Sequence, residues 1–246
     1  MKLKHQLPTY SIIDHLSLDE ELLMELQNCV SELNSEFKSV LEVNKGLCGV
    51  HHDLLKSVYD NFFQISLTDS VVENKDITMD ECEVVNDTLY KNGYRHKQSL
   101  ALDDNSVLNE STYTSKTDIY HRYAHIFDKV LAKFKGSPTR IRLVKLESGS
   151  NISPHIDYDP SYAVRIIIPI FADSDCVNVF WVKNHIESVM FKPGHAYFLN
   201  TGYKHAVMNF SKNDRYTFMI SINGTEDIQH LIKRTTLLTK KLKYLS

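Results

Sequence analysis

Two histidines and one aspartate of this chain have the types and spacing of a metal site. His155 and Asp157 lie in the sequence Pro-His-Ile-Asp, and in an extended chain residues two apart point to the same side. His205 lies downstream, after a β-rich segment. Two imidazoles and one carboxylate bind one face of a metal ion and leave the other positions open, as in non-haem Fe(II) oxygenases. A closed zinc site would need four ligands, usually thiolates, and no cysteine is suitably placed.

The pattern His-x-Asp is weak on its own, because the chain contains a second copy at 51–53. Only the copy at His155 is followed by the other expected features. These are, in chain order, a β-rich segment, a Pro-Gly turn, a strand, His205 and Arg215. A single histidine is more often an ordinary hydrogen-bonded residue than a ligand, but the combination favours a metal site. His185 and His195 are rival third ligands. We predict that both lie on the surface, since neither is followed by an arginine at the same step.

Arg215 opens a strand whose two faces differ in character. One face carries Arg215, Thr217, Met219 and Ser221, and the other carries Tyr216, Phe218, Ile220 and Ile222. The second face is expected to pack in the core, which leaves the arginine on a cavity wall. A buried guanidinium needs an anionic partner, and a dicarboxylate cosubstrate can supply one through a bidentate pair. The alternative is a surface strand end, at which Arg215 pairs with Asp214 or with solvent.

The segment from Arg142 to Asn223, about a third of the chain, resembles a known enzyme family. The matching motifs are Arg-Leu-Val-Lys-Leu-Glu-Ser-Gly (142–149), Pro-His-Ile-Asp (154–157), Val-Arg-Ile-Ile-Ile-Pro-Ile (164–170), Lys-Pro-Gly (192–194), Phe-Leu-Asn-Thr-Gly-Tyr-Lys-His-Ala-Val-Met-Asn (198–209) and Arg215. They are similar to the aspartyl/asparaginyl β-hydroxylase-like Fe(II)/2-oxoglutarate oxygenases, and nearest in pattern to bacterial hydroxylases of free amino acids such as proline. The most specific feature is the step of ten residues from His205 to Arg215.

The resemblance implies roles for four of these residues. His155, Asp157 and His205 would bind Fe(II), Arg215 would bind the far carboxylate of 2-oxoglutarate, and O2 would be the second cosubstrate. The vertebrate enzyme that names the group lacks a carboxylate ligand, whereas this sequence keeps Asp157. The chain is therefore more similar to the hydroxylases that act on small molecules.

Three further polar residues are candidates for supporting roles. Arg165 opens a strand ten residues after His155, and the resemblance implies that it binds a substrate carboxylate. The alternative for Arg165 is an arginine that solvates a strand end. Arg142 shares one strand face with two apolar residues, so it is a second candidate for contact with the substrate. Asn209, four residues after His205, would hydrogen-bond either the loop backbone or the groups around the metal ligands.

The hydrophobic pattern divides the chain into a helical and a β-rich part. Apolar residues recur at helical spacing from Leu18 to Phe37, and Ser17 with Glu20 forms a capping box that predicts the helix start. A second helix is predicted from Tyr120 to Phe134. No firm elements are assigned at 45–115. After Thr139 the pattern alternates, and it predicts strands at 142–146, 164–170, 177–182, 188–191, 195–199 and 216–222.

These elements predict an α+β fold. By resemblance its core is a double-stranded β-helix, a jelly roll related to the cupins, with the N-terminal helices packed on one face. We expect one integrated domain of three parts. Residues 1–138 would form a helical and mixed extension over the core, 139–225 the jelly-roll catalytic core, and 226–246 a C-terminal helical tail.

Composition excludes some partners. The 246 residues carry a formal net charge of -3, and the isoelectric point near 6.4 gives no basic field for nucleic acid or an anionic membrane. No apolar run approaches the roughly 20 residues of a membrane helix. The first residues do not resemble a signal peptide, and the four cysteines form no CxxC pair, so we expect free thiols and a cytoplasmic protein.

The sequence therefore predicts an Fe(II)- and 2-oxoglutarate-dependent dioxygenase that hydroxylates an unactivated C–H bond of a free amino acid or a close derivative. The first alternative is hydroxylation of an amino-acid side chain in a peptide or protein, with the N-terminal part as docking surface. The second is a cupin-like module that binds a metal or small acid without turnover. The substrate, the carbon attacked and the oligomeric state are left open.

Overall fold

Two antiparallel sheets make up most of the structure, a computed structural model that describes residues 3–40, 61–71, 110–157, 159–160 and 163–223. In spatial order the larger sheet contains β1 (Tyr10–Ile12), β11 (Tyr197–Leu199), β8 (Ala163–Phe171), β13 (Arg215–Asn223), β6 (Pro138–Leu146), β3 (Phe62–Ser66) and β2 (Lys38–Ser39). The smaller sheet contains β10 (His185–Met190), β9 (Cys176–Val182), β12 (Lys204–Asn209) and β7 (Asn151–His155). A separate ribbon pairs β4 (Thr68–Ser70) with β5 (Tyr113–Lys116).

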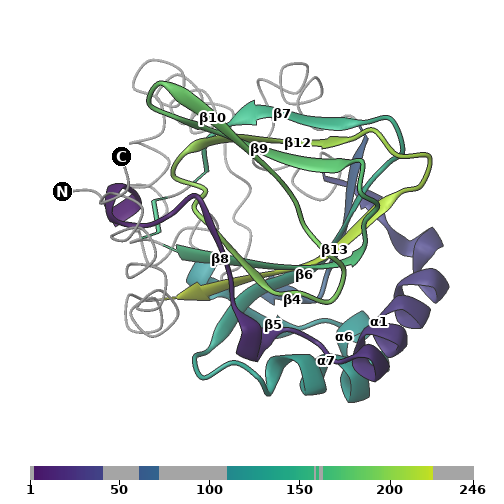
Figure 1. Ribbon diagram of the computed structural model, residues 1–246. Helices are drawn as coiled ribbons and strands as arrows, with labels where there is room; N and C mark the ends of the chain where they lie inside the picture. Colours follow the sequence, from purple (N-terminus) through teal and green to yellow (C-terminus); the bar gives the residue numbers. More distant parts are fainter. Residues whose placement is uncertain (1–2, 41–60, 72–109, 158, 161–162, 224–246) are drawn as a thin grey trace, which may run out of the picture.

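The chain alternates between the two sheets from β6 to β13. β6, β8, β11 and β13 lie in the larger sheet, and β7, β9, β10 and β12 lie in the smaller one. Figure 1 shows the smaller sheet lying opposite the strands β6, β8 and β13. Eight antiparallel strands connected in this way form a jelly roll, the topology of the double-stranded β-helix.

Helices contact the outer face of the larger sheet (Figure 1). They are α1 (Glu20–Glu32), α6 (Asp118–Arg122) and α7 (Ala124–Leu131). The described chain also has short 3₁₀ helices, η1 (Leu3–Gln6), η2 (Asp14–Leu16), η3 (Asn34–Glu36) and η5 (Glu110–Thr112). Leu26 of α1, Phe127 of α7 and Phe218 of β13 are fully buried in one hydrophobic cluster. Each such side chain stabilises the fold by about 1.5–3 kcal/mol. Phe218, Ile220 and Ile222 form the packed face of β13, as its alternation predicted.

The predicted start of the first helix is wrong by two residues. Asp19 is the N-cap, and its carboxylate accepts a hydrogen bond from the Leu22 N–H at 2.9 Å. Ser17 lies outside the helix, where its hydroxyl accepts a bond from the Ala196 N–H. Aspartate at this position also carries a negative charge next to the positive end of the helix dipole, which stabilises the helix start.

The predicted second helix is interrupted. Tyr123, with φ of -116° and ψ of 25°, ends α6 and precedes α7, so the segment forms two short helices. All six predicted strands are present, but β1 to β5, β7 and β12 were not predicted as strands. The proposed C-terminal helical tail lies outside the described residues. Among the described residues, no helix combines the length and the apolar character needed to cross a lipid bilayer.

Candidate functional site

Adjacent strands of the smaller sheet bring His155 and His205 together. His155 is the last residue of β7, and the antiparallel register pairs it with His205 of β12. Their ring centroids lie 4.3 Å apart. One ligand atom from each of His155, Asp157 and His205 lies within 4.8 Å of the others, so the structure assembles the three predicted metal ligands.

The two imidazoles turn the same nitrogen toward Asp157. His155 Nε2 lies 3.8 Å from Asp157 Oδ1, and His205 Nε2 lies 3.9 Å from Asp157 Oδ2. Both Nδ1 atoms lie next to a backbone carbonyl oxygen two residues earlier, at 2.7 Å for His155 and 3.0 Å for His205. Because a carbonyl only accepts, each Nδ1 carries a proton, and Nε2 is the nitrogen turned toward Asp157. Metal-binding histidines commonly have this orientation.

His205 is the more buried of the two histidines, with 8% of its side chain exposed. Burial, reinforced by neighbouring His155, lowers the pKa of His205 to about 4. The ring is therefore neutral near pH 7, which is the form that binds a metal. Two neutral nitrogens and one carboxylate are the donor set of a non-haem iron site. Separations of 3.8 and 3.9 Å also fit two ligands of one ion at bond lengths of about 2.1 Å.

Asp157 lies just after β7, and the loop before β12 holds it in place. The backbone N–H of Asp157 donates to the carbonyl oxygen of Thr201 at 3.0 Å. The neighbouring Asn200 is fully buried, and its amide donates to the carbonyl oxygens of Lys4 and Pro8 at 3.0 and 3.1 Å. The N-terminal arm therefore braces the loop that orients the carboxylate.

Arg215 lies on the inner face of the larger sheet, at the start of β13. It is 6% exposed, and both terminal nitrogens donate to the side-chain oxygen of Asn178, on β9 of the opposite sheet, at 3.3 Å. Its Nε is buried and has no hydrogen-bond partner among the described residues. Burial lowers the pKa of Arg215 to about 10. Asp214 pairs with Lys145 instead, so the alternative of a surface strand end is wrong.

No carboxylate of the described residues forms an ion pair with Arg215. A guanidinium buried with only a neutral amide for a partner is costly, and an anion relieves that cost. Because its fork of N–H donors matches the geometry of a carboxylate, the side chain fits one end of a dicarboxylate.

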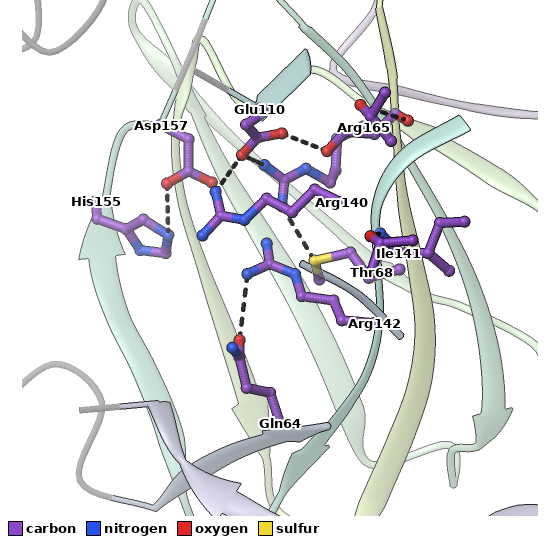
Figure 2. Close-up of polar contacts among 12 residues, drawn as sticks. Gln64, Thr68, Glu110, Arg140, Ile141, Arg142, His155, Asp157 and Arg165 are labelled. Atoms are coloured by element: carbon purple, nitrogen blue, oxygen red, sulfur yellow. Dashed lines mark hydrogen bonds and ion pairs between the residues drawn. The ribbon is translucent and has the colours of Figure 1, made fainter. Parts of the chain in front are cut away.

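A second group of charged side chains lies around Glu110 of η5 (Figure 2). Glu110 is 1% exposed and pairs with Arg165 Nη2 at 2.9 Å, with Arg140 Nη1, and with the hydroxyl of Ser221. Burial alone would raise the pKa of Glu110, but Arg165, Arg140 and Arg142 lower it to about 2. Glu110 is therefore ionised. Sequence reasoning missed this residue, since it lies at the end of a stretch without a clear pattern.

A β-bulge shapes this group. The register between β6 and β13 shifts between Met219 and Ser221, so that Arg140 and Ile141 lie opposite a single residue of β13. Arg140 has a φ of 43°, in the left-handed region that costs a non-glycine residue about 1–2 kcal/mol. Bulges of this kind re-aim side chains next to active sites. Here the bulge accompanies the contact between Arg140 and Glu110.

Asn209 is fully buried and supports two loops by hydrogen bonds. Its amide nitrogen donates to the carbonyl oxygens of Leu146, Glu147 and Asn213 at 3.2, 3.1 and 2.9 Å. Its oxygen accepts bonds from the backbone N–H and the hydroxyl of Ser211 and from Cys176. These contacts connect the end of β6 to the turn before Arg215, and they match the first of the two roles considered for Asn209.

Replacing Asn209 by alanine is expected to destabilise the protein by about 3 kcal/mol, because several buried polar groups lose their partner. That corresponds to a melting temperature about 6–12 °C lower. Thermal unfolding of Asn209→Ala beside Asn213→Ala tests this. The control removes an exposed amide that bonds Asp173, and it is expected to change the melting temperature much less. Equal, small changes in both variants would contradict the role of Asn209.

The rival histidines lie apart from the three clustered ligands. His185 has 60% of its side chain exposed and bonds Glu187, while His195 is exposed and bonds the carbonyl oxygen of Pro193. Both were predicted to lie on the surface, which the structure confirms.

A family model described as aspartyl/asparaginyl beta-hydroxylase matches residues 86–224, which is more than half of the 246-residue chain. No curated protein matches the chain significantly. Among solved structures, a 2OG-Fe(II) oxygenase family oxidoreductase from Burkholderia pseudomallei is similar, with 11% identity, a TM-score of 0.45, and coverage of 87% of this chain and 84% of that one. A prolyl hydroxylase from Trichoplax adhaerens, in complex with a hypoxia inducible factor peptide, has 8% identity, a TM-score of 0.49 and coverage of 87% and 83%. A Pseudomonas putida prolyl-4-hydroxylase has 8% identity, a TM-score of 0.46 and coverage of 88% and 93%.

The matched segment contains all eight strands of the jelly roll, the clustered side chains of His155, Asp157 and His205, and the buried Arg215. The family predicted from the motifs is thereby confirmed, and with it the enzyme class, a hydroxylase. The chain belongs to the aspartyl/asparaginyl β-hydroxylase family.

Proposed function

We propose that the chain is an Fe(II)- and 2-oxoglutarate-dependent dioxygenase that hydroxylates an unactivated C–H bond of a free amino acid or a close derivative. The observation that carries the proposal is the combination of the His155, Asp157 and His205 cluster with Arg215, a buried guanidinium that no carboxylate of the described residues neutralises. A module that binds a metal or a small acid without turnover would not be expected to keep both features.

The donor set fits Fe(II). His155 and His205 would each bind it through Nε2, and Asp157 would bind it through its carboxylate. When bound, Fe(II) with 2-oxoglutarate and O2 supplies the oxidant that inserts one oxygen atom into a C–H bond, with succinate and carbon dioxide as coproducts. The backbone carbonyls hold a proton on each Nδ1 atom, which leaves Nε2 as the nitrogen that would bind the metal.

Arg215 would bind the far carboxylate of 2-oxoglutarate, and Asn178 would orient it. Asn178 is 3% exposed, and its oxygen lies 3.3 Å from both terminal nitrogens of the arginine. This contact fixes the plane of the guanidinium before the cosubstrate arrives. Because the surroundings are buried, the ion pair forms with little competition from water, which strengthens it.

The organisation and location of the chain are also part of the proposal. Residues 1–138 would cover the jelly-roll core at 139–225, with 226–246 as a helical tail, in one integrated domain. The hydrophobic cluster shared by α1, α7 and the larger sheet supports the first part. We place the protein in the cytoplasm, and the free, buried thiols of Cys29 and Cys176 support a reducing compartment.

Succinate release tests the proposal. The protein is incubated with Fe(II), ascorbate, 2-oxoglutarate and air, together with each proteinogenic amino acid, and the products are analysed by mass spectrometry. We expect succinate and one amino acid heavier by one oxygen atom, with neither product under nitrogen. Oxygen incorporation only into peptides would favour the peptide alternative. The absence of oxygen-dependent 2-oxoglutarate consumption with both kinds of substrate would refute the dioxygenase and favour the non-catalytic module.

A further inference from the structure

The loop between β11 and β12, residues 200–203, is in contact with three parts of the chain. It leads into β12, which carries His205, it binds the backbone of Asp157, and it contacts residues 4–9, the N-terminal arm. The arm leads into β1, which pairs with β11 just before the loop. The N-terminal arm therefore lies against the loop that adjoins two of the three proposed metal ligands.

Asn200 makes most of the contact between the arm and the loop. It is fully buried, and its side-chain amide donates to the carbonyl oxygens of Lys4, Leu7 and Pro8 at 3.0, 3.5 and 3.1 Å. Its backbone N–H donates to the carbonyl oxygen of Thr9 at 2.8 Å. One residue of the loop thus contacts four carbonyl oxygens of the arm.

The side-chain oxygen of Asn200 shows that this residue is not an optimal choice for stability alone. The oxygen is buried and has no hydrogen-bond partner among the residues that the structure describes. A buried polar atom without a partner costs stability, and an apolar side chain of similar volume would avoid that cost. What the asparagine provides instead is the pair of N–H donors that hold the arm.

A second set of contacts joins the arm to the segment that follows Asp157. The backbone N–H of Lys4 donates to Asp159 Oδ2 at 3.3 Å, and Lys4 Nζ donates to the carbonyl oxygen of Gly202 at 2.8 Å. Asp159 is 3% exposed. Lys4 therefore connects the chain just beyond Asp157 to the same loop that binds the Asp157 N–H.

Asp157 depends on these contacts more than the two histidines do. His155 is the last residue of β7 and His205 lies in β12, so the pairing of the two strands holds both. Asp157 lies beyond the end of β7, and its backbone N–H donates to the carbonyl oxygen of Thr201, the residue after Asn200. A shift of the loop would therefore move the carboxylate more than the imidazoles.

We propose that Asn200 is a positioning residue for the metal site, and that it acts through the backbone of Asp157. The inference rests on the proposed function. It makes the N-terminal arm part of the site, although the arm lies outside the matched segment 86–224. The affinity for the metal should then depend on the arm, even though the three proposed ligands all lie elsewhere in the chain.

The Zn(II) affinity of the full-length, metal-free protein tests this, by competition with a chromophoric chelator. Asn200→Ala is expected to bind Zn(II) about 10-fold or more weakly than wild type, as when a group that orients a metal ligand is removed. Asn209→Ala is the matched control, because Asn209 is an equally buried asparagine that donates to backbone carbonyls next to Arg215 instead. It should melt lower but keep its Zn(II) affinity within about threefold of wild type. Equal loss of affinity in both variants would overturn the proposal.

A double-mutant cycle tests whether Asn200 acts through Asp157. Asn200→Ala is expected to have little further effect on the Zn(II) affinity of Asp157→Ala, but to weaken binding by His155→Ala about 10-fold. A merely structural role would not produce this difference. A loss of the same size in both backgrounds would indicate a general loosening of the fold, and the proposal would be wrong.

Gly202→Ala disturbs the same contact without removing a polar side chain, and it serves if Asn200→Ala fails to fold. A Cβ here would lie 3.0 Å from Lys4 Cβ and 3.3 Å from Asn200 Oδ1, so the arm and the loop must shift apart by a few tenths of an ångström. We expect weaker Zn(II) binding that again requires Asp157. Wild-type affinity in both Asn200→Ala and Gly202→Ala would overturn this inference alone, whereas a wild-type protein that bound no Zn(II) would overturn the metal site as well.

Discussion

The His205→Ala variant is expected to lose metal-dependent turnover, by more than about 100-fold. Groups one step further from a metal already change affinity or activity by about 10–100-fold, and His205 would bind the metal directly. Its Nε2 lies 3.9 Å from Asp157 Oδ2 and has no other role that the structure shows, so the loss should be in metal binding. Succinate release and the content of bound Fe(II) after anaerobic loading measure both effects.

A matched control exists for this variant. His195 also turns its Nδ1 toward the carbonyl oxygen two residues earlier, at 3.2 Å from Pro193, but it lies on the surface away from the cluster. His195→Ala is expected to retain wild-type iron content and turnover. If His205→Ala retained its iron and its succinate release, the assignment of the metal ligands would fail. Asp157→Ala is expected to behave as His205→Ala does.

The cluster of His155, Asp157 and His205 was predictable because it depends on local chain geometry and on the pairing of two strands. Residues two apart in an extended chain share a side, which brings His155 and Asp157 together without any knowledge of the fold. His205 was identified by its place between the Pro-Gly turn and Arg215, because the strand that carries it was not predicted. The sequence of β12, Lys-His-Ala-Val-Met-Asn, alternates weakly, and its pairing with β7 and β9 supplies what its own pattern does not.

β7 was missed for a related reason. It contains Pro154, which cannot donate to a ladder, and β12 is its only neighbour among the described strands of the sheet, which makes it an edge strand. Helices and central strands were easier, since Leu26, Phe127 and Phe218 repeat an apolar pattern that burial in the core explains.

Glu110 was not predictable from the sequence. An isolated glutamate in a polar stretch normally faces water, and only tertiary structure shows that three arginines surround it. Its presence changes the interpretation of Arg165, which resemblance alone assigned to the substrate. Arg215 differs from Glu110 in this respect. Its place on the inward face of β13 could be predicted from the alternation of the strand, and a buried guanidinium there suggested an anionic ligand.

Replacing Arg215 by glutamine is expected to reduce the affinity for 2-oxoglutarate by about 30-fold or more, because a buried charge pair loses one partner. 2-Oxobutanoate, which lacks the far carboxylate, should bind wild type and Arg215→Gln with similar affinity. This comparison separates the lost ion pair from a general distortion of the site. Calorimetry on the Zn(II)-loaded proteins measures all four affinities, and equal loss for both ligands would contradict the assignment.

Without ligand, Arg215→Gln is not expected to lower the melting temperature of the protein. Burial lowers the pKa of Arg215 to about 10, so the charged side chain is disfavoured where it lies, and Asn178 is its sole hydrogen-bond partner among the described residues. Glutamine is neutral and removes the buried charge, although its shorter side chain ends before the position of the nitrogens that donate to Asn178. We therefore expect Arg215→Gln to melt no lower than wild type without ligand, and to gain less stability from 2-oxoglutarate. A large loss of stability without ligand would show that Arg215 stabilises the fold. It would contradict the assignment of Arg215 to anion binding.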